Sequence, residues 1–338
     1  MAGRTRFPKV KVQELRDDCI RFELSDTDIS VANALRRVMI AETPTLAIDL
    51  VTIETNTSVM QDEFLAHRLG LIPIRYHRGD VSKFRFNYDC DCEDYCHQCA
   101  VLFSLDVSFD QRAAMRPDHE SDLPLTVTSQ DLVSNNPDVQ AVHFASADEQ
   151  QQSQDAGIAL LKLARGQAIK LTAIAKLGTQ KEHSKWCTCC VATYQYDPII
   201  KLNEEKLDQL SSEQVDQLAE SCPVGVFEVD EKTGKLTVVN RMDCMYCEEC
   251  TRLGDTMKAR SEDDPFIDIH ADTNVFLFTV ETNGALLAEE VVLSALTVLG
   301  AKLRDLQMAC MEIKEEQGNR QEANATPGST ASSTLPSS

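Results

Sequence analysis

The chain has 338 residues, of which 43% are hydrophobic, and this is enough for two or three domains of ordinary globular composition. Its formal net charge of −21 argues against direct nucleic-acid contact, because proteins that grip DNA or RNA carry a basic surface. No stretch approaches the roughly 20 apolar residues of a membrane span, and the start MAGRTRFPKVKV lacks the apolar centre of a signal peptide. We therefore expect an intracellular protein that does not enter a membrane.

The first predicted elements are a hairpin and an amphipathic helix. Residues 9–24 read as two strands, KVKVQEL and CIRFEL, on either side of the polar turn RDD. In the helix that follows, Val31, Leu35 and Val38 form an apolar stripe, and Pro44 limits its length. Periodicity alone favours a helix that packs on the core of its own domain.

Residues 47–187 carry many short strand-like runs, such as VLFSLDVSF and LPLTVTS, and a short helix around 61–69 that stops at Gly70. We predict a mostly β insert domain. Within it, residues 145–155 are polar and nearly free of large apolar side chains, which is typical of a mobile loop.

Four cysteines within ten residues, Cys90, Cys92, Cys96 and Cys99, predict a structural zinc site in this insert. Four thiolates this close can surround one tetrahedral Zn²⁺ at about 2.3 Å each, with no coordination position left open for catalysis. Two readings stay open beside it. The cysteines are free and buried, or His97 replaces one of them as a ligand.

A second cysteine group lies in a small region at residues 203–262. Cys244, Cys247 and Cys250 follow one another at C-x2-C-x2-C spacing, and Cys222 stands before a proline. This spacing crowds a single tetrahedral ion but fits three corners of a [4Fe-4S] or [3Fe-4S] cluster, with Cys222 as the fourth ligand. A second zinc site and a vestigial or disulfide-bonded site are the alternatives. A third set, at residues 187–190 beside a tryptophan, lacks a clear fourth ligand, so packing is its default role.

The chain then returns to regular structure. Residues 275–284 predict a buried strand, and a helix of about 45 Å follows from about 286 to 314. Apolar residues repeat along it at alternating steps of four and three, which is a heptad stripe: Val292, Leu296, Leu299, Leu303, Leu306, Cys310 and Ile313. Such a helix either lies on its own sheet or is partly buried by another chain, and its length favours the second. We expect residues 318–338 to form a disordered tail.

Several motifs in one order resemble the RNA polymerase α-like subunits, a family that includes the third-largest subunit of RNA polymerase II, its archaeal counterpart and bacterial α. They are NALRR at 33–37 with AETP at 41–44, FLAHRLGLIPI at 64–74, and KEHSKW at 181–186. The resemblance implies an α+β fold with a dimerisation domain formed from both chain ends. This domain takes 8–46 and 263–317 together with 188–202. The insert domain takes 47–187, and a ferredoxin-like cysteine region takes 203–262.

The resemblance also implies a function. Family members are non-catalytic scaffold subunits that pair with a smaller α-like subunit to start assembly of the polymerase. They also contact the second-largest subunit and small zinc-binding subunits, and the polymerase II members act in the nucleus. The loop at 90–99 is similar to the zinc loop of those members, whereas the polymerase I and III and archaeal counterparts typically lack it. The expected contact residues are Leu35, Arg36, Arg37, Val38, Leu296, Leu299, Leu303 and Leu306.

The residues themselves indicate no catalytic site. The chain contains no P-loop, no G-x-S-x-G elbow, no H-E-x-x-H and no tight aspartate cluster for paired Mg²⁺. We therefore expect no enzyme activity from the chain alone. The rival from another class is a ferredoxin-like redox protein, suggested by the second cysteine group, and the rival scaffold is the polymerase I and III or archaeal counterpart.

Overall fold

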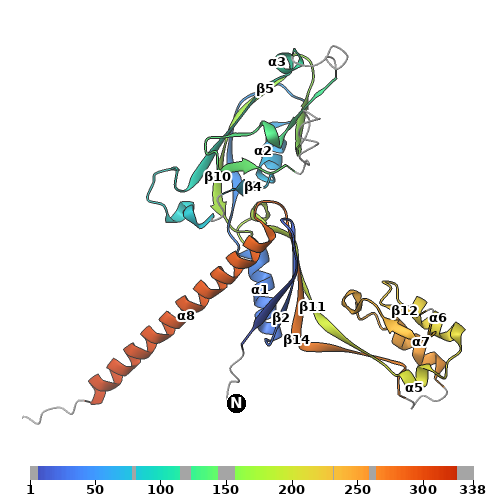
Figure 1. Ribbon diagram of the computed structural model, residues 1–338. Helices are drawn as coiled ribbons and strands as arrows, with labels where there is room; N and C mark the ends of the chain where they lie inside the picture. The colour runs from blue at the N-terminus through green and yellow to red at the C-terminus, as the bar shows by residue number, and fades with distance from the viewer. Residues whose placement is uncertain are drawn as a thin grey trace, which may run out of the picture.

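The computed structural model describes residues 7–77, 81–114, 123–143, 157–230, 232–258 and 264–325. These residues form three bodies: a first domain at the centre, an insert domain on one side of it, and a small cysteine-rich region at the end of a two-stranded arm (Figure 1). Across these ranges, no helix combines the length and hydropathy needed to cross a bilayer. The polar loop predicted at 145–155 lies outside the described residues.

The first domain is a four-stranded antiparallel sheet in the order β1 (Lys9–Leu15), β2 (Cys19–Ser25), β14 (Ile267–Thr282) and β11 (Cys189–Leu202). Strands from both ends of the chain therefore share one sheet. The rings of Phe22 and Phe278 stack on its inner face with centroids 4.9 Å apart. The mixed α+β class predicted from the sequence is confirmed.

Helix α1 (Ile29–Ala41) lies on this inner face of the sheet, where apolar side chains of the strands gather. The Asp28 carboxylate caps its first turn, accepting hydrogen bonds from the backbone N–H groups of Ser30 (3.0 Å) and Val31 (3.1 Å). Leu35 and Val38 of the predicted stripe pack into the core together with Ala32 and Met39, whereas Val31, the third residue of that stripe, is 43% exposed.

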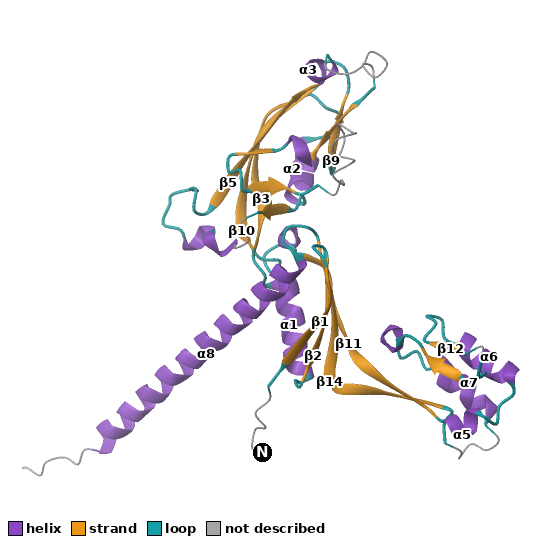
Figure 2. Cartoon of the chain, in the orientation of Figure 1, coloured by secondary structure: helices purple, strands orange, loops and turns teal. Residues whose placement is uncertain are grey.

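The insert domain has a main sheet in the order β3 (Thr45–Asn56), β10 (Ala168–Gly178), β5 (Ala100–Ser108) and β7 (Val133–Ser134). Helix α2 (Asp62–Gly70) contributes the buried Leu65 and Leu69 to the insert core. Two small sheets and a short helix complete it: β4 (Ile74–Tyr76) with β8 (Val139–Ala141), β6 (Leu125–Thr128) with β9 (Ala159–Leu163), and α3 (Phe109–Ala113). The insert is built mainly of strands (Figure 2), as its short apolar runs predicted.

The cysteine-rich region has a hydrophobic core of its own, which includes Leu218, Val226 and Ile267. Its elements are α5 (Glu204–Leu207), α6 (Ser212–Glu220), β12 (Phe227–Val229), β13 (Leu236–Val238) and α7 (Glu249–Met257). The arm that carries it consists of the outer parts of β11 and β14, where Asp197 pairs with Asp272 and Leu202 with Ile267.

Helix α8 (Ala288–Ala325) begins in the first domain and then leaves it (Figure 1). Val291 and Ala295 near its start are fully buried, whereas every described side chain from 302 to 317 is exposed. Further along the helix, the ammonium of Lys302 binds the Glu42 carboxylate at 2.8 Å and links α8 to the end of α1. The helix is longer than predicted, so residues 318–325 of the expected tail are helical, and residues 326–338 lie outside the described residues.

Candidate metal centre and partner surface

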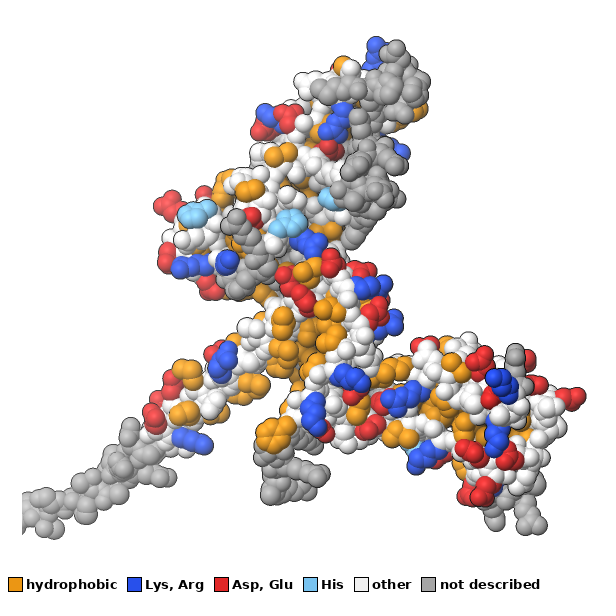
Figure 3. Space-filling view, in the orientation of Figure 1, with side chains coloured by type: hydrophobic (Ala, Val, Ile, Leu, Met, Phe, Trp, Pro, Cys, Tyr) orange, Lys and Arg blue, Asp and Glu red, His pale blue; other side chains and the backbone are white. Residues whose placement is uncertain are grey.

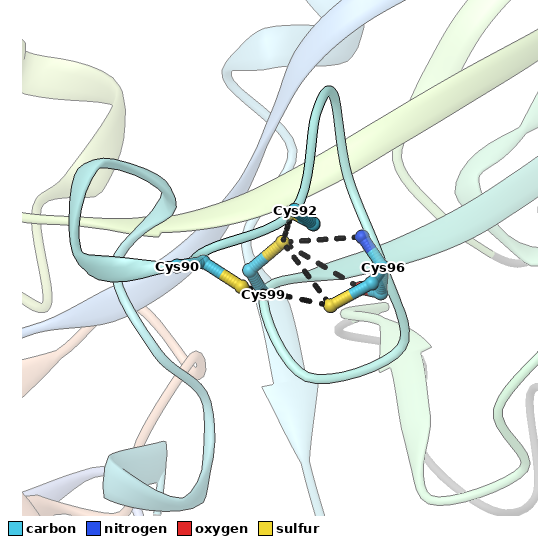
Figure 4. A group of neighbouring side chains, drawn as sticks. All are labelled: Cys90, Cys92, Cys96 and Cys99. Carbon is cyan, nitrogen blue, oxygen red and sulfur yellow. Dashed lines mark hydrogen bonds between the residues drawn. The ribbon is translucent and has the colours of Figure 1, made fainter.

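Four thiols of the insert domain converge in the cysteine loop, residues 90–99 (Figure 4). The Sγ atoms of Cys90 and Cys96 are 3.6 Å apart, as are those of Cys92 and Cys99, and the Sγ atoms of Cys96 and Cys99 are 3.9 Å apart. A tetrahedron with metal–sulfur distances of about 2.3 Å has sulfur–sulfur edges of about 3.8 Å. The side chains therefore have the spacing that one Zn²⁺ requires.

The loop holds this shape through its backbone. The Ala100 N–H donates to the Cys96 carbonyl at 2.9 Å, closing the turn that leads into β5. The Arg85 N–H donates to the Gln98 carbonyl at 2.9 Å, and this bond joins the two ends of the loop. Cys99 is fully buried, so one ligand is fixed by the insert core, while Cys90, Cys92 and Cys96 are half-buried.

The thiol pKa values show why this cluster suits a cation. A hydrogen bond with the Cys90 thiol is the main cause that raises the pKa of Cys92 to about 12. The backbone N–H of Gln98 is the main cause that lowers the pKa of Cys96 to about 7. Neighbouring sulfurs share protons, because several thiolates this close repel one another. A bound divalent cation removes that repulsion, and the four-cysteine set can therefore bind a metal such as zinc.

The second cysteine group is not gathered in the same way. Among the described residues, the cysteine loop is the only set of three or more potential ligands whose ligand atoms all lie within 4.8 Å of one another. Cys244 and Cys250 are buried, Cys222 is half-buried and Cys247 is exposed. The expected iron–sulfur cluster therefore has no support from the arrangement of these thiols, and His97, which is exposed, lies outside the gathered set.

The third set of cysteines follows the packing prediction only in part. Cys189 is buried, and its thiol lies 3.7 Å from the Met39 carbonyl oxygen at the end of α1. Cys190 is exposed on the neighbouring position of the strand. Cys187 is half-buried, and the hydrogen bond from the Cys189 thiol lowers its pKa to about 6. These three residues do not form a ligand group in the described structure.

The structure corrects the expected contact residues on α1. Leu35 and Val38 are only 3% and 4% exposed, because the apolar stripe faces the chain's own sheet. They belong to the core and are not available to another subunit. The Arg36 guanidinium binds the Asn33 side-chain oxygen within the helix at 2.9 Å, whereas Arg37 is exposed.

Helix α8 keeps its apolar residues on the outside. Leu296, Leu303 and Leu306 are 47%, 59% and 61% exposed, although Leu299 is half-buried against the core. Hydrophobic side chains also gather where α8 leaves the first domain (Figure 3). An exposed heptad stripe is an unsatisfied helix-packing surface, since exposed apolar patches of this kind mark sites of protein contact.

A second uncovered surface lies on β1, and the sequence did not predict it. Val10 and Val12 pair with Leu24 and Phe22 across the ladder, so all four side chains lie on the inner face of the sheet. Val10 and Val12 are nevertheless 59% and 52% exposed, whereas their partners are buried. In the described part of the chain, the helices cover β2 but leave β1 uncovered. The alternation in KVKVQEL predicts which side chains share a face, but not how far the helix layer extends.

The family model described as the RNA polymerase Rpb3/Rpb11 dimerisation domain matches residues 21–303. A relative from Dictyostelium discoideum named DNA-directed RNA polymerase II subunit rpb3 is 44% identical, over 90% of this chain and 95% of the relative. The Arabidopsis thaliana subunit 3 of RNA polymerases II, IV and V is 42% identical over 90% and 92% of the two chains. The archaeal polymerase subunit Rpo3 of Methanosphaera stadtmanae is 32% identical over 87% and 95%.

Proposed function

Because the chain belongs to the RNA polymerase Rpb3/Rpb11 dimerisation-domain family, we propose that it pairs with a smaller α-like subunit and nucleates polymerase assembly. It is a scaffold subunit of DNA-directed RNA polymerase II and has no catalytic role of its own. The polymerase II relatives are more similar to it, at 44% and 42% identity, than the archaeal relative at 32%. We propose that it acts in the nucleus, where polymerase II acts.

The observation that carries this proposal is the exposed stripe of α8. The helix projects from its domain with Leu303 and Leu306 exposed, so packing against its own chain stabilises this part of it little. Burying both leucines on a partner helix removes their apolar surface from water, which stabilises the pair. The Lys302–Glu42 ion pair links the helix to the end of α1 just before Leu303 and Leu306. Val10 and Val12 extend the proposed contact to the sheet, and the exposed Arg37 stays a proposed contact residue on α1.

We propose two further contacts, which the resemblance to the family implies. One is the second-largest polymerase subunit, and the other is the pair of small zinc-binding subunits. Direct contact with nucleic acid is not expected from a chain of net charge −21.

Affinity purification from nuclear extract tests the assembly role. We expect the tagged chain to recover a smaller α-like subunit together with the largest subunit of polymerase II. Recovery of the largest subunits of polymerases I and III instead would assign the chain to the rival scaffold. Recovery of the chain alone, with an intact α8, would contradict the scaffold role.

We also propose that the second cysteine group, Cys222, Cys244, Cys247 and Cys250, closes on a metal. Tyr246 and Glu248, on either side of Cys247, have left-handed backbone φ angles of 54° and 61°, which are costly for such residues. The Val226 N–H lies 3.4 Å from the Cys222 sulfur, the kind of donor that stabilises a thiolate ligand. These features favour a ligand-bearing loop over free thiols, and both a cluster and a second zinc suit four cysteines.

Metal and acid-labile sulfide analysis of protein purified without oxygen distinguishes these outcomes. One zinc per chain with iron, sulfide and broad absorbance near about 400 nm indicates a retained iron–sulfur cluster. Two zinc ions without iron indicate a second zinc site and end the ferredoxin-like alternative. One zinc and no iron in the native chain, with that zinc content unchanged when Cys244 and Cys250 are replaced by serine, would contradict a second metal site.

A further inference from the structure

The polypeptide passes between the first domain and the insert twice, once at residues 42–44 and again at residues 179–188. We call the second passage the strap. Its length exceeds that of the first passage, and its residues bind both domains. A connection that only spans a gap needs no such contacts, so the strap has a role in how the domains are held.

One side of the strap is bonded to the first domain. The Lys181 N–H donates to the Ala41 carbonyl at the end of α1 (3.0 Å), and the Thr188 hydroxyl donates to the Met39 carbonyl (3.3 Å). Thr188 is fully buried. The Asn283 side-chain amide also donates to the Cys187 carbonyl at 2.6 Å. The strap therefore satisfies carbonyl groups at the end of α1, which a helix leaves without partners.

The other side of the strap is packed into the root of the insert sheet. Trp186 is buried, and its ring NH donates to the Lys176 carbonyl of β10 at 3.1 Å. The ring lies against Gly178 so closely that a Cβ atom at that position would come within 2.4 Å of it. Gly178 is thus required by close approach, because no larger residue leaves room for the indole.

A partly buried charge group fixes the same corner. The Lys185 ammonium binds the Asp49 carboxylate at 2.5 Å and lies 4.3 Å from the centre of the Trp186 ring. Asp49 has no backbone partner in the ladder with β10, because the register shifts between Ile48 and Leu50. This bulge turns the carboxylate toward the strap, which is a common use of bulges. The Lys185 side chain is only 14% exposed, so solvent screens the pair less than a surface pair.

We propose that the strap sets the orientation of the insert domain relative to the dimerisation domain, with Trp186 as its positioning residue and Asp49 as its charged anchor. The strap is short, and it both donates hydrogen bonds to α1 and packs on β3 and β10. A change of angle between the domains must therefore break either the hydrogen bonds to α1 or the packing contacts with the insert sheet. The two domains then present their surfaces to the rest of an assembly as one rigid body.

The test uses the full chain bound to its smaller α-like partner, or the chain alone if no partner is recovered. Fluorescent labels on non-canonical residues at Lys11, in β1, and Asp106, in β5, report the distance between the domains by single-molecule energy transfer. We expect one narrow distribution for the native chain and at least a twofold broadening for Trp186→Ala. Trp186→Phe keeps a ring over Gly178 and restores most of the narrow width.

Controls separate orientation from folding. Asp49→Asn removes the charge without creating a cavity, and we expect a smaller broadening with the metal content of the cysteine loop unchanged. Val133→Ala removes an exposed side chain of β7, which pairs with β5 and not with the strands that the strap contacts, and it should leave the width at its native value. If Trp186→Ala loses metal and unfolds the insert, the widths of the distance distributions of Asp49→Asn and Trp186→Phe test the proposal in its place. A native width in Asp49→Asn, or in folded Trp186→Ala, would overturn the proposal.

Discussion

Replacing Leu303 and Leu306 of α8 with aspartate is expected to weaken pairing with the smaller α-like subunit by about 100-fold or more. Both side chains are exposed in the free chain, at 59% and 61%, so the stability of the chain itself should change by less than about 0.5 kcal/mol. In the complex, two carboxylates would lie where apolar surface is buried, and an unpaired buried charge costs several kcal/mol. Co-purification and isothermal titration with the partner measure the effect.

Met308 and Met311 provide the matched control for this prediction. They are 61% and 55% exposed on the same helix, and helical geometry places them well away from the Leu303–Leu306 stripe. Substituting both with aspartate adds the same charge, and we expect native pairing. Loss of pairing in both double variants would indicate that the partner contacts more than one face of α8. Native pairing in the leucine variant would show that this part of α8 is not in the interface.

The α1 helix shows what the sequence could and could not predict about this interface. Pro44 limits the helix, which ends at Ala41, and Leu35 and Val38 are buried as their spacing predicted, although Val31 of the same predicted stripe is exposed. The sequence pattern does not predict which part of the molecule covers that stripe. Periodicity shows which side chains share one face of a helix, but not what that face packs against. The sheet assembled from both chain ends covers it, and it forms only through pairing between β2 and β14, distant in sequence.

The same distinction explains α8 and the cysteines. The heptad spacing predicted a helix too long for its own domain, and the exposed Leu303 agrees with that prediction. The close spacing of Cys90, Cys92, Cys96 and Cys99 confines them to one loop, so their convergence was predictable. Cys222 is separated from Cys244 by a hairpin, and its position depends on how α6, β12 and β13 pack. Spacing alone could not place it.

Removing the metal from the cysteine loop is expected to unfold the loop locally while leaving the first domain intact. Metal binding of this kind can supply on the order of 10 kcal/mol to local folding. Outside the thiols, the loop has little to replace that contribution, because only Cys99 is fully buried and Tyr88 and Tyr95 are exposed. Hydrogen exchange should therefore accelerate across residues 85–99 after chelation, whereas the strands of the first domain keep their protection.

Substitution of single ligands tests the same site without a chelator. We expect Cys92→Ser and Cys96→Ser each to lower the zinc content by one ion per chain, measured by mass spectrometry of the metal. Cys310→Ser is the control, because Cys310 is exposed on α8 and lies outside the cysteine loop. The loop leads into β5, which pairs with β10 in the insert sheet. Its unfolding should therefore lower the stability of the insert domain, and it should have a smaller effect on the affinity for a partner bound through α8. Unchanged zinc in both ligand variants would contradict a metal site at residues 90–99.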